Sequence, residues 1–185
     1  LSGFAAPDAA GVYQGFDASL CKAIAAAVLG DPAKVKFIPL SSETRFTALA
    51  AGEVDVLIRN STFTYSRDND LKLDFPAINY YDGQGFMVKK ELGVSSAKEL
   101  DGATICIQTG TTTELNLADF FKQNNITYTP VTVQDEAEAQ RNYLAGSCDA
   151  HTTDASGLAS TRSSFPDPEN HIILPEIISK EPLGP

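Results

Sequence analysis

The sequence is short of basic side chains, of histidine and of long apolar segments. Lysine and arginine number 14 against 24 acidic residues, which gives a formal net charge of −10. Nucleic acids and anionic membrane surfaces are bound through an excess of Lys and Arg, so both are disfavoured as partners. No apolar segment approaches the roughly 18–20 residues of a membrane-spanning helix. The two histidines, His151 and His171, belong to no HExxH motif, and CxxC spacing is absent, so no metal or cofactor is expected.

The composition is that of a folded globular protein. Hydrophobic residues make up 43% of the chain and charged residues 21%, so a packed core is expected. A length of 185 residues suits one ordinary domain or two small lobes. Neither end reads as a natural chain end, because residues 1–4 read as a loop and residues 181–185 as a connection. We therefore expect the sequence to be part of a longer protein.

The three cysteines are compatible with two interpretations. Cys106 and Cys148 lie in segments of β character, whereas Cys21 lies in a helical segment. All three thiols could be buried and act as small hydrophobic side chains. Alternatively, the protein is exported, Cys106 is bridged to Cys148, and the partner of Cys21 lies outside this sequence.

Helical and strand patterns alternate along most of the chain. One helix is predicted from Asp17, as its cap, to Gly30, and another opens at a capping box formed by Thr111 and Glu114. Further helices are expected at 43–51 and 135–145, and strands at 35–40, 54–58, 104–108 and 126–133. This alternation favours an α/β fold with a largely parallel sheet.

A weak internal repeat relates residues 51–60 to residues 145–154. Both segments read as a helix end, a glycine, a turn with an aspartate and a strand that ends in a polar residue, Asn60 or Asp154. Open α/β sheets bind ligands beyond the carboxyl ends of their strands. Two similar lobes would therefore present Asn60 and Asp154 to a shared cleft. The alternative is a chance match between two copies of a common helix–glycine–strand connection.

Arg67 and the segment 110–113 are candidates for anion binding. Arg67 follows Asn60 after a run of small hydroxyl residues, and its planar guanidinium matches a carboxylate. The alternative for Arg67 is a surface ion pair with Asp68 or Asp70. The segment 110–113 opens a helix directly after a strand, so its free N–H groups favour an anion, and the alternative is an ordinary helix cap. A P-loop lysine is missing, which disfavours nucleotide phosphate.

Asp154 is the candidate for cation binding. A carboxylate at the end of a buried strand is costly unless it is paired, and an ammonium group would pair it. The alternative is a cap on the following segment, 155–161. Together, Arg67 and Asp154 would supply an anion clamp and a cation acceptor on opposite lobes. A zwitterion with an α-carboxylate and an α-ammonium fits both.

Residues 80–88 have the composition of a strand interrupted by two glycines, which could absorb a hinge change. We expect this segment to cross from one lobe to the other, and residues 177–185 to contain a second crossing. Lobe one is predicted at 1–86, lobe two at 87–180, and the start of the second hinge crossing at 181–185.

Motifs that extend along essentially the whole chain carry a family resemblance, at 15–17, 45–57, 66–68, 79–88, 110–115, 148–150, 152–154 and 173–185. In these motifs the chain resembles the polar amino-acid branch of the bacterial periplasmic solute-binding proteins of ABC transporters, family 3. It is closest to the general L-amino-acid-binding type. The resemblance implies a two-lobed α/β fold of periplasmic-binding-protein type II. Lobe one is then truncated, because its first strand and its C-terminal return are missing.

The resemblance also implies roles for individual residues. Arg67 would hold the α-carboxylate of the ligand, helped by the amide of Thr62 and by Thr112. Asp154 would hold the α-ammonium together with the backbone carbonyl of Asn60. No residue is expected to be catalytic or to bind a metal.

Two further expectations follow from the resemblance. Relatives often place an aromatic ring near the position of Ser42, and here Phe63 or Tyr65 is the candidate to replace it. The missing first strand of the family carries a cysteine that faces the first helix, which would explain an unpaired Cys21. We also predict a Cys106–Cys148 disulfide, because both cysteines lie in lobe two on strands that we expect to be neighbours in a parallel sheet.

The expected function is to bind free L-amino acids in an interlobe cleft in the periplasm and to deliver them to an ABC permease. The precursor would carry a signal peptide, and no reaction or cofactor is implied. One alternative is a periplasmic dehydratase-type enzyme, for which His151 is the one candidate acid or base. Another is a sensor domain fused to a receptor.

Overall fold

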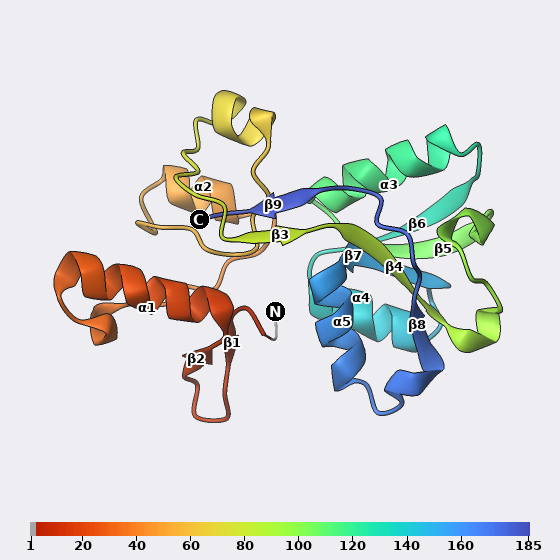
Figure 1. The fold of residues 1–185 in the computed structure, drawn as a ribbon, viewed down its shortest axis with the longest axis horizontal. Coiled ribbons are helices and arrows are strands. Elements are labelled where there is room, and N and C mark those ends of the chain that lie inside the picture. The colour runs from red at the N-terminus through yellow and green to blue at the C-terminus, as the bar shows by residue number, and fades with distance from the viewer. Residues whose placement is uncertain (1–2) are drawn as a thin grey trace. The chain divides into compact units, whose positions relative to one another are not determined.

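A computed structural model describes residues 3–185 and divides them into two compact units (Figure 1). Unit 1 comprises the chain as far as Leu40, with Thr44–Tyr80 and Leu183–Pro185, and unit 2 comprises Ser41–Glu43 and Tyr81–Pro182. Strands β3 (Tyr80–Asp82) and β9 (Glu181–Leu183) form a two-stranded sheet, and the division between the units falls within both strands. Within residues 3–185, every helix is too short or too polar to cross a lipid bilayer.

Unit 2 is built on a five-stranded mixed sheet in the order β6-β5-β7-β4-β8. The pairs β5–β6 and β5–β7 are parallel, whereas β4 runs antiparallel to both β7 and β8. The predicted parallel arrangement therefore holds for three of the strands only. The strand bounds are β4 Gln84–Lys89, β5 Ala103–Gln108, β6 Tyr128–Val133, β7 Ala150–Asp154 and β8 His171–Ile173.

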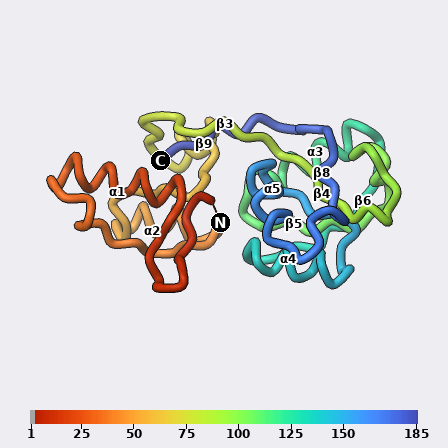
Figure 2. The backbone as a smooth tube through the Cα atoms, turned by 60° about the horizontal axis from the view of Figure 1, so that its bottom comes forward, coloured from red at the N-terminus to blue at the C-terminus, as the bar shows by residue number. Residues whose placement is uncertain are grey.

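Three helices cover the two faces of this sheet, as Figures 1 and 2 show, with α3 on one face and α4 and α5 on the other. Helix α3 (Thr112–Gln123) begins where predicted, because the Thr111 hydroxyl accepts the Glu114 N–H at 3.2 Å. Asp135 caps helix α4 (Glu136–Leu144) by accepting the Glu138 N–H at 2.8 Å. Helix α5 (Ala155–Ser164) directly follows β7.

Each face of the sheet has its own hydrophobic core. The α3 side contains Phe86, Val88, Ile105, Ile107, Leu117, Phe121 and Leu174. The opposite side contains Met87, Cys106, Val133, Ala139, Tyr143, Cys148, Leu158 and Phe165. The predicted disulfide is confirmed: Cys106 in β5 is joined to Cys148 just before β7, with 5.6 Å between their Cα atoms. Cys21 is a free thiol.

Unit 1 contains fewer regular elements. Helix α1 (Phe16–Leu29) ends at Gly30, whose φ of 71° supplies a left-handed cap. Helix α2 (Arg45–Ala50) is shorter than the predicted 43–51, and β1 (Ala6–Pro7) pairs with β2 (Tyr13–Gln14). Short 3₁₀ turns occur in the two units at Pro32–Lys34, Lys90–Leu92, Ala97–Glu99 and Pro168–Asn170, and a π turn occurs at Ser66–Asp70.

Two strand predictions in unit 1 are wrong. Residues 35–40 and 54–58 are not strands, and Val56 is 44% exposed although a buried strand was expected there. A strand needs hydrogen bonds to a neighbouring strand, and neither segment has such a neighbour among residues 3–185. The repeat therefore forms only in part: Gly52 and Gly146 share a left-handed conformation, but only the second is followed by a strand.

Candidate ligand-binding site

In unit 1, Arg67 is a buried residue. It lies in the π turn Ser66–Asp70 and is only 7% exposed, which distinguishes it from a surface arginine. Its Nη1 donates to the Thr62 carbonyl at 2.8 Å, and its backbone N–H donates to the Thr64 hydroxyl at 3.1 Å. Arg67 therefore contacts Thr62 directly. The family resemblance predicts that these two residues bind the ligand carboxylate together.

The ring of Phe46 in α2 supports the Arg67 guanidinium. The Arg67 Cζ atom lies 4.9 Å from the ring centroid, and the Arg45 Cζ atom lies 4.6 Å from the same centroid. Arg45 is 3% exposed and donates through Nη1 to the Arg59 carbonyl and to the Ser61 hydroxyl, both at 3.3 Å. Cation–π contacts of this kind orient a guanidinium as well as stabilise it. Sequence reasoning assigned no role to Phe46 or Arg45, although both lie in the motif at 45–57.

Asn60 is held in an uncommon backbone conformation by Asp17. Its φ is 32°, and its N–H donates to Asp17 Oδ2 at 3.3 Å. Asp17 is 4% exposed, and burial raises the pKa of its carboxyl group. The predicted role of Asp17 as helix cap is wrong, because α1 begins at Phe16 with Gly15 in the capping position. Asp17 instead connects the first turn of α1 to the backbone of Asn60. The carbonyl of Asn60 is the group that the resemblance predicts to bind the ligand ammonium.

In unit 2, Asp154 ends strand β7 and is 6% exposed. It also occupies the position before helix α5, but its side chain makes no capping hydrogen bond there. The alternative reading of Asp154 as a helix cap therefore has no support in the geometry. A buried carboxylate at a strand end remains, as the sequence predicted.

Thr112 opens helix α3, and its hydroxyl is engaged with a buried acid. The Oγ1 atom donates to Glu181 Oε2 at 2.9 Å, and Glu181 Oε1 accepts from Asn116 at 2.8 Å and from Ser179 at 2.6 Å. Glu181 is 1% exposed. Since the single hydroxyl proton of Thr112 is donated to Glu181, a contact from Thr112 to an anion would come from its backbone N–H at the helix start.

The candidates for an aromatic wall differ in exposure. Ser42 is buried, and Tyr65 is 76% exposed. Phe63 is 39% exposed and packs edge-to-face against Phe75, with 5.4 Å between ring centroids. Phe63 is thus the candidate whose ring is held by a neighbour.

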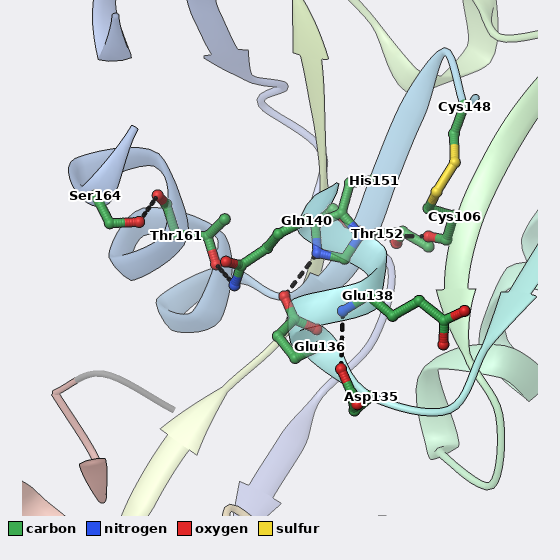
Figure 3. Close-up of polar contacts among 11 residues, drawn as sticks. Cys106, Asp135, Glu136, Glu138, Gln140, Cys148, His151, Thr152, Thr161 and Ser164 are labelled. Carbon is green, nitrogen blue, oxygen red and sulfur yellow. Dashed lines mark hydrogen bonds and ion pairs between the residues drawn. A yellow bond between two sulfur atoms is a disulfide. The ribbon is translucent and has the colours of Figure 1, made fainter. Parts of the chain in front are cut away.

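His151, the one candidate acid or base, is enclosed on the other side of unit 2 (Figure 3). It is 0% exposed, with Nε2 2.7 Å from Glu136 Oε1 and Nδ1 3.4 Å from the Cys106 carbonyl. In β7, His151 lies on the α4 side of the sheet, whereas Asp154 belongs to the alternate set of residues that faces the α3 side.

The chain shares its amino-acid sequence pattern with a protein family. It matches the bacterial extracellular solute-binding proteins, family 3, over residues 2–159. The chain belongs to this family. Its α/β fold is accordingly that of a type II periplasmic binding protein, as the resemblance implied.

Individual members of family 3 are similar along the entire chain. The chain is 74% identical over 185 residues to the glutamate/glutamine/aspartate/asparagine-binding protein of Rhodobacter capsulatus, and 60% identical to the general L-amino acid-binding periplasmic protein of Rhizobium johnstonii. These matches cover 100% of this chain and 55% and 54% of the relatives. The chain thus spans about half the length of the curated relatives that it matches.

One solved structure extends the comparison. It is that of a periplasmic binding protein of an ABC transporter from Brucella ovis with glutathione bound. The match has a TM-score of 0.95 at 56% sequence identity, and it covers 98% of this chain and 57% of that chain.

Proposed function

We propose that the chain is the ligand-binding part of a periplasmic protein that binds free L-amino acids and delivers them to an ABC permease. The observation that carries this proposal is the 74% identity along all 185 residues to a protein named for binding glutamate, glutamine, aspartate and asparagine. The Rhizobium relative is named as periplasmic and as a general L-amino acid binder, which supports both the compartment and the ligand class.

The two buried charges support the same ligand class. Arg67 in unit 1 and Asp154 in unit 2 are buried side chains of opposite sign, and a carboxylate suits the first as an ammonium suits the second. An α-amino acid carries one carboxylate and one ammonium, which we assign to Arg67 and Asp154 respectively. The Thr62 amide and the Thr112 N–H would assist with the carboxylate, and the Asn60 carbonyl with the ammonium. The lobe limits 1–86, 87–180 and 181–185 stay predictions.

Glutathione is a second candidate ligand. A solved structure at 56% identity to this chain is described with glutathione bound. The γ-glutamyl end of glutathione keeps a free α-carboxylate and a free α-ammonium, so the same two charged residues are suited to it. Amino acids and glutathione therefore belong in one binding assay.

We propose binding without chemical conversion of the ligand. A general acid or base must reach its substrate through one hydrogen bond or one water. His151 is buried between Glu136 and the Cys106 carbonyl, on the sheet face opposite to that of Asp154. The dehydratase alternative therefore has no support at His151. A receptor sensor domain would bind the same ligands, and a transport assay distinguishes it from a transport protein.

The proposal can be tested with the full-length protein. Calorimetry against the common L-amino acids and glutathione is expected to show binding of at least one of them with one ligand per protein. Deletion of the gene is expected to reduce uptake of that ligand by the bacterium. If neither amino acids nor glutathione bind, the proposed function is wrong. If one binds and uptake is unchanged by the deletion, the sensor alternative is favoured.

A further inference from the structure

Gln84 is a buried polar residue that the proposed function leaves without a role. It begins strand β4 and is 0% exposed. Its Nε2 donates to the Thr113 carbonyl and to the Thr152 hydroxyl, both at 3.0 Å. Its Oε1 has no hydrogen-bond partner among residues 3–185.

The position of Gln84 connects the two parts of the site in unit 2. Gln84 lies directly opposite Asp154 in the antiparallel pair of β4 and β7, so both side chains are on the same face of the sheet. The bond to Thr113 reaches the first turn of α3, next to Thr112, and the bond to Thr152 reaches β7 itself. One side-chain amide thus holds the strand that ends in Asp154 and the helix that begins with Thr112.

The amide of Gln84 is not needed to satisfy its neighbours. The Thr152 hydroxyl has its own acceptor, the Gly85 carbonyl at 2.7 Å. The Thr113 carbonyl lies in the first turn of α3, where the helix itself supplies a donor. Meanwhile the Oε1 atom is a buried acceptor without a donor, which destabilises a folded protein. The unsatisfied Oε1 thus offsets the stability that the two donated hydrogen bonds contribute, whereas an apolar side chain of similar length would leave no unsatisfied group.

We propose that Gln84 is a positioning residue, which fixes the end of β7 against the start of α3 and thereby sets the affinity for the ligand. The two donated hydrogen bonds hold the Asp154 carboxylate and the Thr112 N–H at one spacing before the ligand arrives. Because less ordering is then required on binding, affinity is higher. This inference rests on the proposed function, since its readout is the affinity for amino acids.

The principal test is the variant Gln84→Met in the full-length protein, with L-glutamine and L-glutamate as probes. Calorimetry is expected to show an affinity about tenfold lower than that of the unaltered protein, which corresponds to about 1.4 kcal/mol of additional ordering cost on binding. The melting temperature without ligand is expected to be equal or higher, because the unsatisfied Oε1 is removed. If Gln84 had a purely structural role, the variant would have an unchanged affinity and a lower melting temperature.

A matched control is available in the same unit. Gln140 also donates from Nε2 to a threonine hydroxyl, that of Thr161 at 2.9 Å, and Figure 3 shows this pair between α4 and α5. Gln140→Met is expected to lower the melting temperature and to leave both affinities unchanged. Thr152→Val, which removes one acceptor of the Gln84 amide, is a second route to the same effect and is expected to lower affinity about threefold.

A double variant tests whether Gln84 acts through Asp154. If it does, Gln84→Met combined with Asp154→Asn lowers affinity by less than the product of the two separate losses. The inference is overturned if Gln84→Met binds both probes like the unaltered protein, if its melting temperature falls together with affinity, or if the two losses multiply fully. If the unaltered protein binds neither amino acids nor glutathione, the proposed function fails and the inference fails with it.

Discussion

Removal of the Cys106–Cys148 disulfide is the perturbation whose magnitude the structure defines best. The bridge joins β5 to the turn before β7, and both cysteines lie in the core on the α4 side of the sheet. The double variant Cys106→Ala/Cys148→Ala removes the link and changes little volume, because both side chains are small. The expected effect is a loss of stability of unit 2 without a change in ligand affinity, since Asp154 belongs to the other face.

The size of the loss follows from the length of the closed loop. The bridged residues are 42 positions apart. In the chain-entropy model, a crosslink over a loop of this length restricts the unfolded chain by about 4 kcal/mol at 25 °C. For a chain of this size, that difference corresponds to a fall of roughly 8–16 °C in melting temperature.

Urea denaturation followed by far-UV circular dichroism measures this change, and the chain itself contains no tryptophan that would serve as a fluorescence probe. Mass spectrometry of a non-reduced digest first confirms that the unaltered protein carries the bridge. Cys21→Ala, compared with the double variant in the same 185-residue chain, is the matched control, because Cys21 is a free thiol there and its removal opens no crosslink. We expect the control to stay within about 1 kcal/mol of the unaltered protein.

Two results would contradict this reasoning. The first is a double variant whose free energy of unfolding is within about 1 kcal/mol of the control, because the loop would then contribute little to the unfolded-state entropy. The second is the detection of free thiols at both Cys106 and Cys148 in protein isolated from an oxidising compartment. That second result would restore the interpretation of the cysteines as buried hydrophobic side chains.

Charge removal gives the remaining predictions. Arg67→Ala is expected to lower amino-acid affinity about tenfold to 150-fold in calorimetry, because a charge-assisted contact contributes about 1.5–3 kcal/mol. Asp154→Asn is expected to weaken binding by at least about 100-fold while the melting temperature without ligand changes little, because the ligand ammonium loses its counter-charge and the amide keeps its shape. Asp17→Asn is expected to stabilise the protein at pH 7. Burial raises the pKa of Asp17 above 3.8 in the folded state, so the ionised carboxyl is destabilising above that raised pKa and the gain disappears as the pH falls towards 3.8.

Each of these predictions has a control and an opposing outcome. For Arg67, the matched control is Arg162→Ala. In the unaltered protein, Arg162 Nε donates to the Pro168 and His171 carbonyls in unit 2, so this variant should alter stability but not affinity. Unchanged binding by Arg67→Ala would remove the carboxylate assignment. A collapse of the melting temperature of Asp154→Asn with unchanged affinity would make Asp154 structural. For Asp17→Asn, a gain that is the same in thermal melts at pH 4 and pH 7 would show that ionisation is not its cause.

Local sequence patterns predicted two helices of unit 2, α3 and α4, and two of its strands, β5 and β6. Thr111 and Asp135 were recognisable as caps because each side chain bonds an N–H only three residues away. The strands at 104–108 and 126–133 were recognisable because they are short apolar or β-branched runs between turn residues. The antiparallel course of β4 was not, because strand direction depends on where the chain returns and not on the residues of the strand.

In unit 1 the same kind of pattern failed. Residues 35–40 keep an alternating burial, with Val35 and Phe37 partly buried and Lys36 and Ile38 exposed, yet they are not a strand. An alternation of buried and exposed side chains shows which side of an extended segment faces the protein. It does not report whether a second segment lies alongside to accept the hydrogen bonds, and that is a property of distant parts of the chain.

The sequence by itself identified the family from its motifs, and it singled out the Cys106–Cys148 pair, Arg67 and Asp154 as candidates. Only the tertiary structure decided that Asp17 holds the backbone of Asn60, that the Thr112 hydroxyl is donated to Glu181, and that Gln84 joins β7 to α3. Each of these contacts links residues at least 29 positions apart. A buried polar side chain takes whichever partner folding brings within hydrogen-bond distance, and no local pattern encodes that partner.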